Sequence, residues 1–202
     1  MDFPVCVTNK NITHSKPNIS VNYPHITNLP HSLTEKKING DIVSLLNNLL
    51  IEQGFYNESL VELVGTYEIK TNERNILSLS LTVYSFTGGA HGLTITKSLT
   101  FDVMTGKQYS LKDLFNPNSN YVEKLSQIIS MKIEAWDVPL LEDFTTIRPD
   151  QDYYLADHTI VIYFQLYEIT PYVYGFPYFP IPIKSIEDII RTEGPLNTLL
   201  TF

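Results

Sequence analysis

The clearest periodic pattern in the chain lies between residues 32 and 54, in SLTEKKINGDIVSLLNNLLIEQG. Apolar residues recur there three or four positions apart, which predicts an amphipathic helix. Ser32 and Glu35 have the spacing of a capping box, and Gly54 is of the residue type that commonly ends helices. The apolar stripe consists of Ile38, Ile42, Leu45, Leu46 and Leu49.

Alternation of apolar and polar residues follows this helix and predicts strands. It runs through residues 60–103, which we expect to form an antiparallel meander with one buried face. The alternation changes phase at Tyr84 and Phe86, and this predicts a bulge or a twist. Residues 3–8 and 18–26 predict two further strands, with Cys6 as a small buried side chain on the first.

A second helix is predicted for residues 118–136, NSNYVEKLSQIISMKIEAW, with Asn120 and Glu123 as a weaker capping pair. Its apolar stripe ends at Trp136, which we expect to be buried and to anchor the helix to a sheet. Residues 152–169 then predict a hairpin, and its second strand is apolar on both faces, as is typical of a central strand.

Residues 178–183, YFPIPI, predict an edge strand, because proline has no backbone N–H to donate to a neighbouring strand. Phe179, Ile181 and Ile183 would then share the face that lies on the core. A short helix is expected over residues 185–190, SIEDII.

The order of these elements predicts the α+β class: antiparallel sheet with two main helices packed on it and a short C-terminal helix, rather than a βαβ winding. We divide the chain into an N-terminal part, residues 1–104, and a C-terminal part, residues 105–202, which we expect to pack as one compact unit.

Charge limits the classes of partner. The formal charge is −8 and lysines and arginines are not clustered, which argues against nucleic acid and anionic membranes and favours a basic partner. No stretch has the length and apolar character of a membrane span, and the start of the chain does not resemble a signal peptide. The sequence as given therefore predicts a cytoplasmic protein, or one at the cell surface or secreted if an export signal has been removed.

The common catalytic and metal-binding motifs are absent from the sequence. The five histidines are not spaced as a metal-binding pair, and we expect no cofactor and no metal. In RPDQD, Asp150 and Asp152 are two residues apart, but the sharp-turn glycine and further oxygen ligands of a calcium loop are missing. We interpret this segment as a solvated turn.

The segment TGGAHG, residues 87–92, joins two of the predicted strands and allows two interpretations. In the structural one, Gly88, Gly89 and Gly92 supply positive φ angles, and His91 is hydrogen-bonded to backbone. In the functional one, His91 is an acid, a base or a ligand contact. We favour the structural interpretation and keep His91 as a contact residue for a partner.

The segment TPYVYGF, residues 170–176, predicts a stiff exposed loop. Tyrosine offers a large contact area for little entropy loss, and proline lowers that loss further, so such a loop suits protein binding. The predicted contact residues are Pro171, Tyr172, Tyr174 and Gly175. The alternative is that both tyrosines merely cover the core.

Three segments together resemble known families: YSFTGGAHG, SLTFDVMTGKQYSLKDLF, and DYYLADHTIVIYFQLYEITPYVYGFPYFPIPI. Their order is similar to that of the bacterial domain families of unknown function numbered 3298 and 4163. These families occur outside the membrane in RsiV-like anti-sigma factors and upstream of the catalytic domain in PdaC-like peptidoglycan deacetylases. The resemblance implies a non-catalytic module, which in RsiV-like proteins senses lysozyme by binding it.

We therefore expect a binding module that is not an enzyme and whose partner is a protein, with a basic muramidase such as lysozyme as one candidate. The first alternative is a module that binds cell-wall glycan through exposed tyrosines. The second alternative is a small hydrolase that uses His91.

Overall fold

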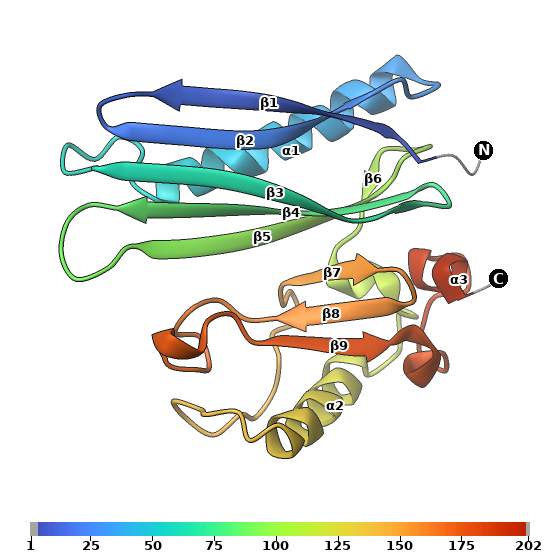
Figure 1. The fold of residues 1–202 in the computed structure, drawn as a ribbon. Coiled ribbons are helices and arrows are strands. Elements are labelled where there is room, and N and C mark those ends of the chain that lie inside the picture. Colours follow the sequence, from blue (N-terminus) through green and yellow to red (C-terminus); the bar gives the residue numbers. More distant parts are fainter. Residues whose placement is uncertain (1–3, 201–202) are drawn as a thin grey trace. The chain divides into compact units, whose positions relative to one another are not determined.

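The computed structural model describes residues 4–200, so Phe3 of the first predicted strand and Met1 lie outside the described residues. The chain divides into two compact units, Met1–Gln108 (unit 1) and Tyr109–Phe202 (unit 2). Each unit has a sheet and at least one helix (Figure 1). The predicted α+β class is confirmed.

Unit 1 is a six-stranded sheet in the order β1-β2-β3-β4-β5-β6, with one long helix. The predicted antiparallel meander forms as β3-β4-β5. Its middle strand β4 is buried on both faces over residues 76–81, so the prediction of one buried face is wrong there. The elements are β1 (Cys6–His14), β2 (Asn18–Thr27), α1 (Ser32–Glu52), β3 (Glu62–Glu73), β4 (Ile76–Phe86), β5 (Leu93–Asp102) and β6 (Lys107–Gln108).

One strand pair of this sheet is parallel, and here the prediction that βαβ winding is absent is wrong. Residues Asn18–Val21 of β2 pair in parallel with Glu62–Gly65 of β3, and α1 forms the crossover between them. At this pair Val21 fills the space where a side chain on residue 65 would stand: a Cβ on Gly65 would lie 2.6 Å from Val21 Cγ1. The glycine therefore allows the close approach of the two strands.

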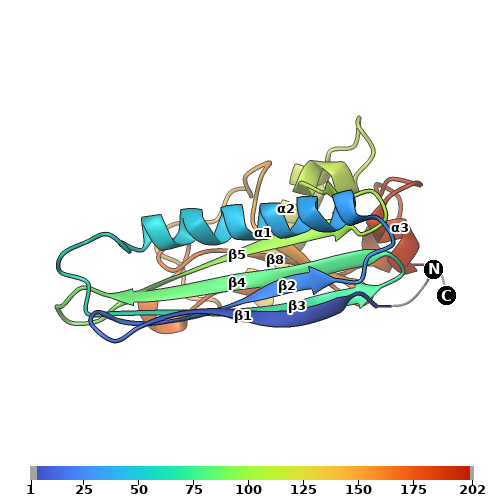
Figure 2. The same ribbon diagram turned by 90° about the horizontal axis from the view of Figure 1, so that it is seen from above.

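Helix α1 covers one face of this sheet (Figure 2). Its apolar stripe packs against the alternating residues Leu77, Leu79, Leu81 and Val83 of β4 in one buried core. The predicted capping box does not form, because His31 is the N-cap and makes no side-chain cap bond. Glu35 instead accepts a hydrogen bond at Oε2 from the backbone N–H of Leu29 (3.1 Å). The helix ends before Gly54, whose φ of +77° suits glycine.

The Asn39 side chain links α1 to the backbone of β2 through two hydrogen bonds. Its Oδ1 accepts from the Ile26 N–H and its Nδ2 donates to the Ile26 carbonyl, both at 2.8 Å. Ile26 is fully buried, so the amide satisfies two backbone groups that would otherwise lose their hydrogen bonds to water.

Two local predictions in unit 1 are wrong. The register of β4 and β5 is continuous through Tyr84, and the irregularity lies instead in β3, between Ile69 and Thr71. Cys6 lies on β1 as expected but is exposed, because its neighbour Val7 is the residue that packs on the core. Successive side chains on a strand point to opposite faces, so only one of the two can be buried there.

Unit 2 has a three-stranded antiparallel sheet in the order β7-β8-β9, so β8 is the central strand and β9 an edge strand. The elements are η1 (Leu111–Leu114), α2 (Tyr121–Ala135), β7 (Tyr153–Ala156), β8 (Thr159–Tyr163), η2 (Tyr172–Tyr174), β9 (Tyr178–Pro182), η3 (Ile183–Ile186) and α3 (Pro195–Leu200). In β9, Phe179 and Ile181 are buried while Tyr178, Pro180 and Pro182 are exposed. The predicted closing helix is only the 3-10 turn η3, and the short C-terminal helix is α3.

Trp136 is the C-cap of α2, and it is not buried as predicted. It remains 47% exposed, yet its ring stacks on Phe179 of β9, and the Lys132 ammonium lies 4.8 Å from the ring centroid. The residue does join the helix to the sheet, through the stacking of its ring on Phe179. About half of the residue stays exposed because Trp136 follows the last turn of α2.

Candidate functional site

A single 3-10 turn shapes the Pro/Tyr-rich loop of unit 2. The N–H of Tyr174 donates to the Pro171 carbonyl and the N–H of Gly175 to the Tyr172 carbonyl, both at 3.0 Å. Gly175 has a φ of +80°, a conformation that favours glycine and lets the chain leave the turn. Val173 is 93% exposed at the tip, and Tyr174 is exposed beside it. We call residues 170–176 the η2 loop.

Tyr167 extends this exposed surface. Its ring contacts that of Tyr172, with centroids 5.4 Å apart, and half of the residue is exposed. Its φ is +64°, which is rare for a bulky side chain and is often found at binding sites. We call Tyr167, Tyr172, Val173 and Tyr174 the aromatic surface. Sequence reasoning identified two of its tyrosines but missed Tyr167.

A polar network holds Tyr167 in place. The Glu168 carboxylate pairs with Nη1 of Arg148 and also accepts from Gln151 Nε2 (3.2 Å) and from the backbone N–H of Gln165 (2.7 Å). Asp152 accepts from Gln165 Nε2 at 2.9 Å. The Asp152 side chain is only 11% exposed, so the prediction of a solvated turn is wrong for this residue. The network fixes the turn at residues 165–168.

A pocket of about 360 Å³ opens beside Tyr167. Leu141, Glu142, Asp143 and Phe144 line it from one side, and Tyr167 and Glu168 from the other. The Leu141 N–H donates to the Ile169 carbonyl (2.9 Å) and joins the two segments. We call this cavity the acidic pocket. No motif marks it in the sequence, because its two walls are more than twenty residues apart.

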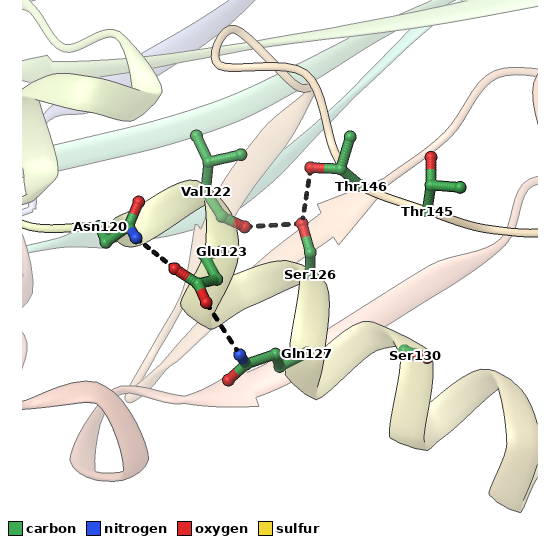
Figure 3. Close-up of a pocket in the computed structure, with 8 residues that line it drawn as sticks. All are labelled: Asn120, Val122, Glu123, Ser126, Gln127, Ser130, Thr145 and Thr146. Atoms are coloured by element: carbon green, nitrogen blue, oxygen red, sulfur yellow. Dashed lines mark hydrogen bonds between the residues drawn. The ribbon is translucent and has the colours of Figure 1, made fainter.

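A second cavity of unit 2 is a polar groove of about 350 Å³ between α2 and residues 145–146 (Figure 3). Ser126 Oγ lies 3.1 Å from Thr146 Oγ1 and donates to the Val122 carbonyl (2.6 Å), so it joins helix to loop. The Glu123 carboxylate accepts from the amide of Asn120 and from Gln127 Nε2 (3.3 Å). The lining residues are Asn120, Val122, Glu123, Ser126, Gln127, Ser130, Thr145 and Thr146.

His91 lies in unit 1 and lines a cavity of about 290 Å³ together with Glu52, Gln53 and Ser85. Its Nδ1 donates to the Gly92 carbonyl (2.9 Å). The Ser85 hydroxyl donates to Gln53 Oε1 (2.6 Å), and Gln53 Nε2 donates to the Val83 carbonyl (3.1 Å). The serine proton is therefore directed to an amide and not to the imidazole. A carboxylate does line the same cavity as His91, which spacing in the sequence could not show.

The glycines of the same loop have two different roles. Gly88 and Gly89 have φ angles of +94° and +107°, as the structural interpretation expects. Gly92 does not have a positive φ; a Cβ on it would lie 2.3 Å from both the Ser85 carbonyl oxygen and Tyr84 Cε2. Its role is therefore to leave room for β4.

The described part of the chain has neither a group of side chains that could bind a metal ion nor a helix that could span a membrane. Within residues 4–200, His, Cys, Asp and Glu side chains form no group of three or more that could hold a metal ion. None of the helices in that range combines the length and the apolar character that crossing a bilayer requires.

These features define an α+β protein of two units with exposed aromatic and polar sites on the second. Residues 8–94 match the family described as "Deacetylase PdaC", and residues 112–184 match the family described as "Protein of unknown function (DUF3298)". The resemblance stated from the sequence is thereby confirmed: the N-terminal match is to the PdaC model and the C-terminal match is to the DUF3298 model.

Two curated relatives come from Bacillus subtilis (strain 168). The anti-sigma-V factor RsiV is 27% identical over 191 residues, which cover 87% of this chain and 66% of RsiV. The peptidoglycan-N-acetylmuramic acid deacetylase PdaC is 24% identical over 139 residues, which cover 65% of this chain and 30% of the deacetylase. The chain thus spans less than two thirds of the length of either relative.

Two solved structures share the fold. One is a DUF3298 family protein from Pseudomonas aeruginosa PAO1, with a TM-score of 0.73 and 17% sequence identity. The match covers 98% of this chain and 97% of the Pseudomonas chain. The other is a DUF3298 family member from Bacteroides fragilis NCTC 9343, with a TM-score of 0.69 and 17% sequence identity. This match covers 96% of this chain and 95% of the Bacteroides chain.

Proposed function

We propose that this protein is a non-catalytic module that binds a basic protein through the aromatic surface of unit 2. The observation that carries the proposal is the exposure of Val173 at the tip of a turn flanked by tyrosines. An apolar side chain in that position gains nothing from the fold, whereas aromatic and apolar side chains in such loops are frequent anchors of protein interfaces.

Charge supports a basic partner. Unit 2 contains six lysines and arginines against thirteen aspartates and glutamates, so it carries −7 of the formal charge of −8. Glu142 and Asp143, which line the pocket beside Tyr167, have no ion-pair partner among residues 4–200. A basic protein approaching this unit would be steered toward the aromatic surface.

The relatives support protein binding as well. RsiV is named for its action against a sigma factor, which is itself a protein. For this chain we name a basic muramidase such as lysozyme as the first partner to test, on the strength of the family resemblance. A partner of that kind would require the module to be at the cell surface or secreted.

The test is surface plasmon resonance with lysozyme at low and at high ionic strength. We expect binding whose association rate falls as salt rises, because electrostatic steering between opposite charges is screened. Cytochrome c is the control, since it is also basic but unrelated in shape. Absence of lysozyme binding would reject lysozyme as the partner, and equal binding of cytochrome c would contradict the proposal of a specific basic partner.

A second candidate function is binding of cell-wall glycan in the polar groove. The groove presents hydroxyl, amide and carboxylate groups, which can hydrogen-bond sugar hydroxyls, and one relative acts on peptidoglycan according to its name. Co-sedimentation with peptidoglycan tests it. Retention should be insensitive to salt and should be lost in Gln127→Ala/Thr145→Ala, because both residues line the groove.

A further inference from the structure

The acidic pocket combines two kinds of surface, apolar or aromatic area and negative charge. Leu141, Phe144 and the half-exposed Tyr167 supply apolar and aromatic area, while Glu142 and Asp143 supply negative charge. The third carboxylate, Glu168, is already engaged by Arg148, Gln151 and the Gln165 N–H. The pocket therefore holds two carboxylates that are available to an incoming group.

The chemistry of these walls selects the ligand. An anion would be repelled, and a purely apolar group would remove carboxylates from water without replacing their hydrogen bonds, which is costly. A cation can pair with the carboxylates and lie against the aromatic ring at the same time. A guanidinium suits both contacts better than an ammonium, because it is planar, pairs with carboxylate through two N–H groups and stacks on aromatic rings.

The size and position of the pocket indicate where that cation comes from. About 360 Å³ is near the lower end for small-molecule sites, so the pocket fits a single side chain rather than a folded element. The contact between the rings of Tyr167 and Tyr172 connects the pocket to the η2 loop. A single partner protein can therefore contact the η2 loop and at the same time place one side chain in the pocket.

We propose that the acidic pocket receives an arginine side chain of the protein partner. This inference rests on the proposed protein-binding function and names the residue type that the partner must present. Glu142 and Asp143 pair with the guanidinium, and the Tyr167 ring lies against it.

The first experiment needs no partner protein. Nα-acetyl-arginine amide is titrated into the ¹⁵N-labelled protein, with Nα-acetyl-citrulline amide, which is similar in shape but neutral, as the matched ligand. We expect amide shifts concentrated in residues 141–146 and 167–169, with citrulline binding at least about tenfold weaker because the charge is lost. Shifts elsewhere, or equal affinity for the two amides, would overturn the proposal.

The second experiment uses variants that remove the same charge from different places. Glu142→Gln/Asp143→Asn should weaken arginine amide binding about tenfold, whereas Glu134→Gln/Glu193→Gln, two exposed carboxylates of unit 2 outside the pocket, should leave it unchanged. If both variants weaken binding equally, only the general charge matters and the pocket is not a site.

The outcomes separate this inference from the proposed function. Arginine amide binding in the pocket without lysozyme binding would keep the pocket and reject lysozyme as the partner. Lysozyme binding that is unchanged in Glu142→Gln/Asp143→Asn, together with absent arginine amide shifts, would keep the module and reject the pocket.

Discussion

The rings of Trp136 and Phe179 are stacked with centroids 5.8 Å apart and planes within 1° of parallel. This pair joins the end of α2 to the edge strand of the unit 2 sheet, but about half of Trp136 stays exposed. The contact is therefore worth less than a fully buried tryptophan, whose loss typically costs about 3–5 kcal/mol.

The first prediction concerns this tryptophan. Trp136→Ala should lower the free energy of unfolding by about 1–2 kcal/mol, from the lost stacking and the partial burial. Urea denaturation measures the change, and Met131→Ala, an exposed residue of the same helix, is the control. Because about half of the indole meets water, its emission should lie between that of a buried and that of a free indole. A strongly blue-shifted spectrum would show that the ring is enclosed.

The second prediction concerns Gly92. Gly92→Ala would place a Cβ 2.3 Å from a backbone oxygen of β4, which cannot move without disturbing the strand pair. We expect a loss of about 1–3 kcal/mol in the free energy of unfolding, as for other overpacked sites. Gly40→Ala is the matched control, since it is helical and a Cβ added to it would meet nothing within 4 Å. That variant should be stabilised by up to about 1 kcal/mol.

Local periodicity was sufficient to predict most of the elements. The stripe from Ile38 to Leu49 and the alternation from Leu77 to Val83 each repeat with the period of one element, and both lie in the core. The same holds for β9, where the prolines restrict the strand to an edge. The parallel pairing of β2 with β3 was not predicted, because strand pairing depends on contacts between distant residues and not on the period of either strand.

The polar sites were harder to predict for a related reason. Glu123, Gln127 and Ser130 resemble the solvent face of an ordinary helix, and only the approach of Thr145 and Thr146 makes that face a groove. The sequence predicts a solvated turn at Asp152, whereas its carboxylate is largely buried and accepts a hydrogen bond from Gln165, at the other end of the hairpin. Polar side chains acquire such roles from partners that no local pattern identifies.

The third prediction tests the amide that links α1 to β2. Asn39→Ala would leave the N–H and the carbonyl of buried Ile26 without their partners. We expect a loss of about 2–3 kcal/mol, since each buried unsatisfied group costs about 1–3 kcal/mol. Asn47→Ala, on the exposed side of the same helix, is the control and should have little effect. Equal stabilities of the two variants would mean that water replaces the amide.

The fourth prediction concerns alkaline pH. Burial raises the pKa of Tyr121 above its ordinary value, and the nearby Asp150 carboxylate raises it further. Its hydroxyl donates to the Pro149 carbonyl (2.8 Å) and its ring stacks on Phe115. The folded protein therefore holds the phenolic proton more tightly than the unfolded chain. This contribution is fully present below about pH 10, the unfolded value, and is lost as the pH rises through the folded pKa.

Tyr121→Phe isolates this contribution. The variant should be less stable at neutral pH by about 1 kcal/mol, because the hydrogen bond to Pro149 is lost. Its free energy of unfolding should also fall less steeply than that of the wild type between about pH 9 and 11. Urea denaturation across that range measures both slopes. Parallel slopes would show that Tyr121 titrates alike in the folded and unfolded chain.

The last prediction concerns the η2 loop and separates binding from folding. Val173 is almost fully exposed and therefore contributes little to the fold, so Val173→Ser should leave the melting temperature unchanged. If the loop contacts the partner, the same change should weaken lysozyme binding. The double variant Tyr172→Ala/Tyr174→Ala should weaken it by about 2 kcal/mol or more, the size of a hot spot. It should also cost some stability, because Tyr172 contacts Tyr167.

The control is Tyr56→Ala, which removes a tyrosine that is 80% exposed on unit 1. It should leave lysozyme binding unchanged, because Tyr56 lies outside the aromatic surface. Calorimetry measures the affinities, and thermal melts followed by circular dichroism measure the stability of each variant. Unchanged affinity in Val173→Ser, together with a double variant that loses stability but not affinity, would mean that Tyr172 and Tyr174 only cover the core of unit 2. Because Val173 has so little to lose in the fold, any effect of its substitution on affinity must come from the interface.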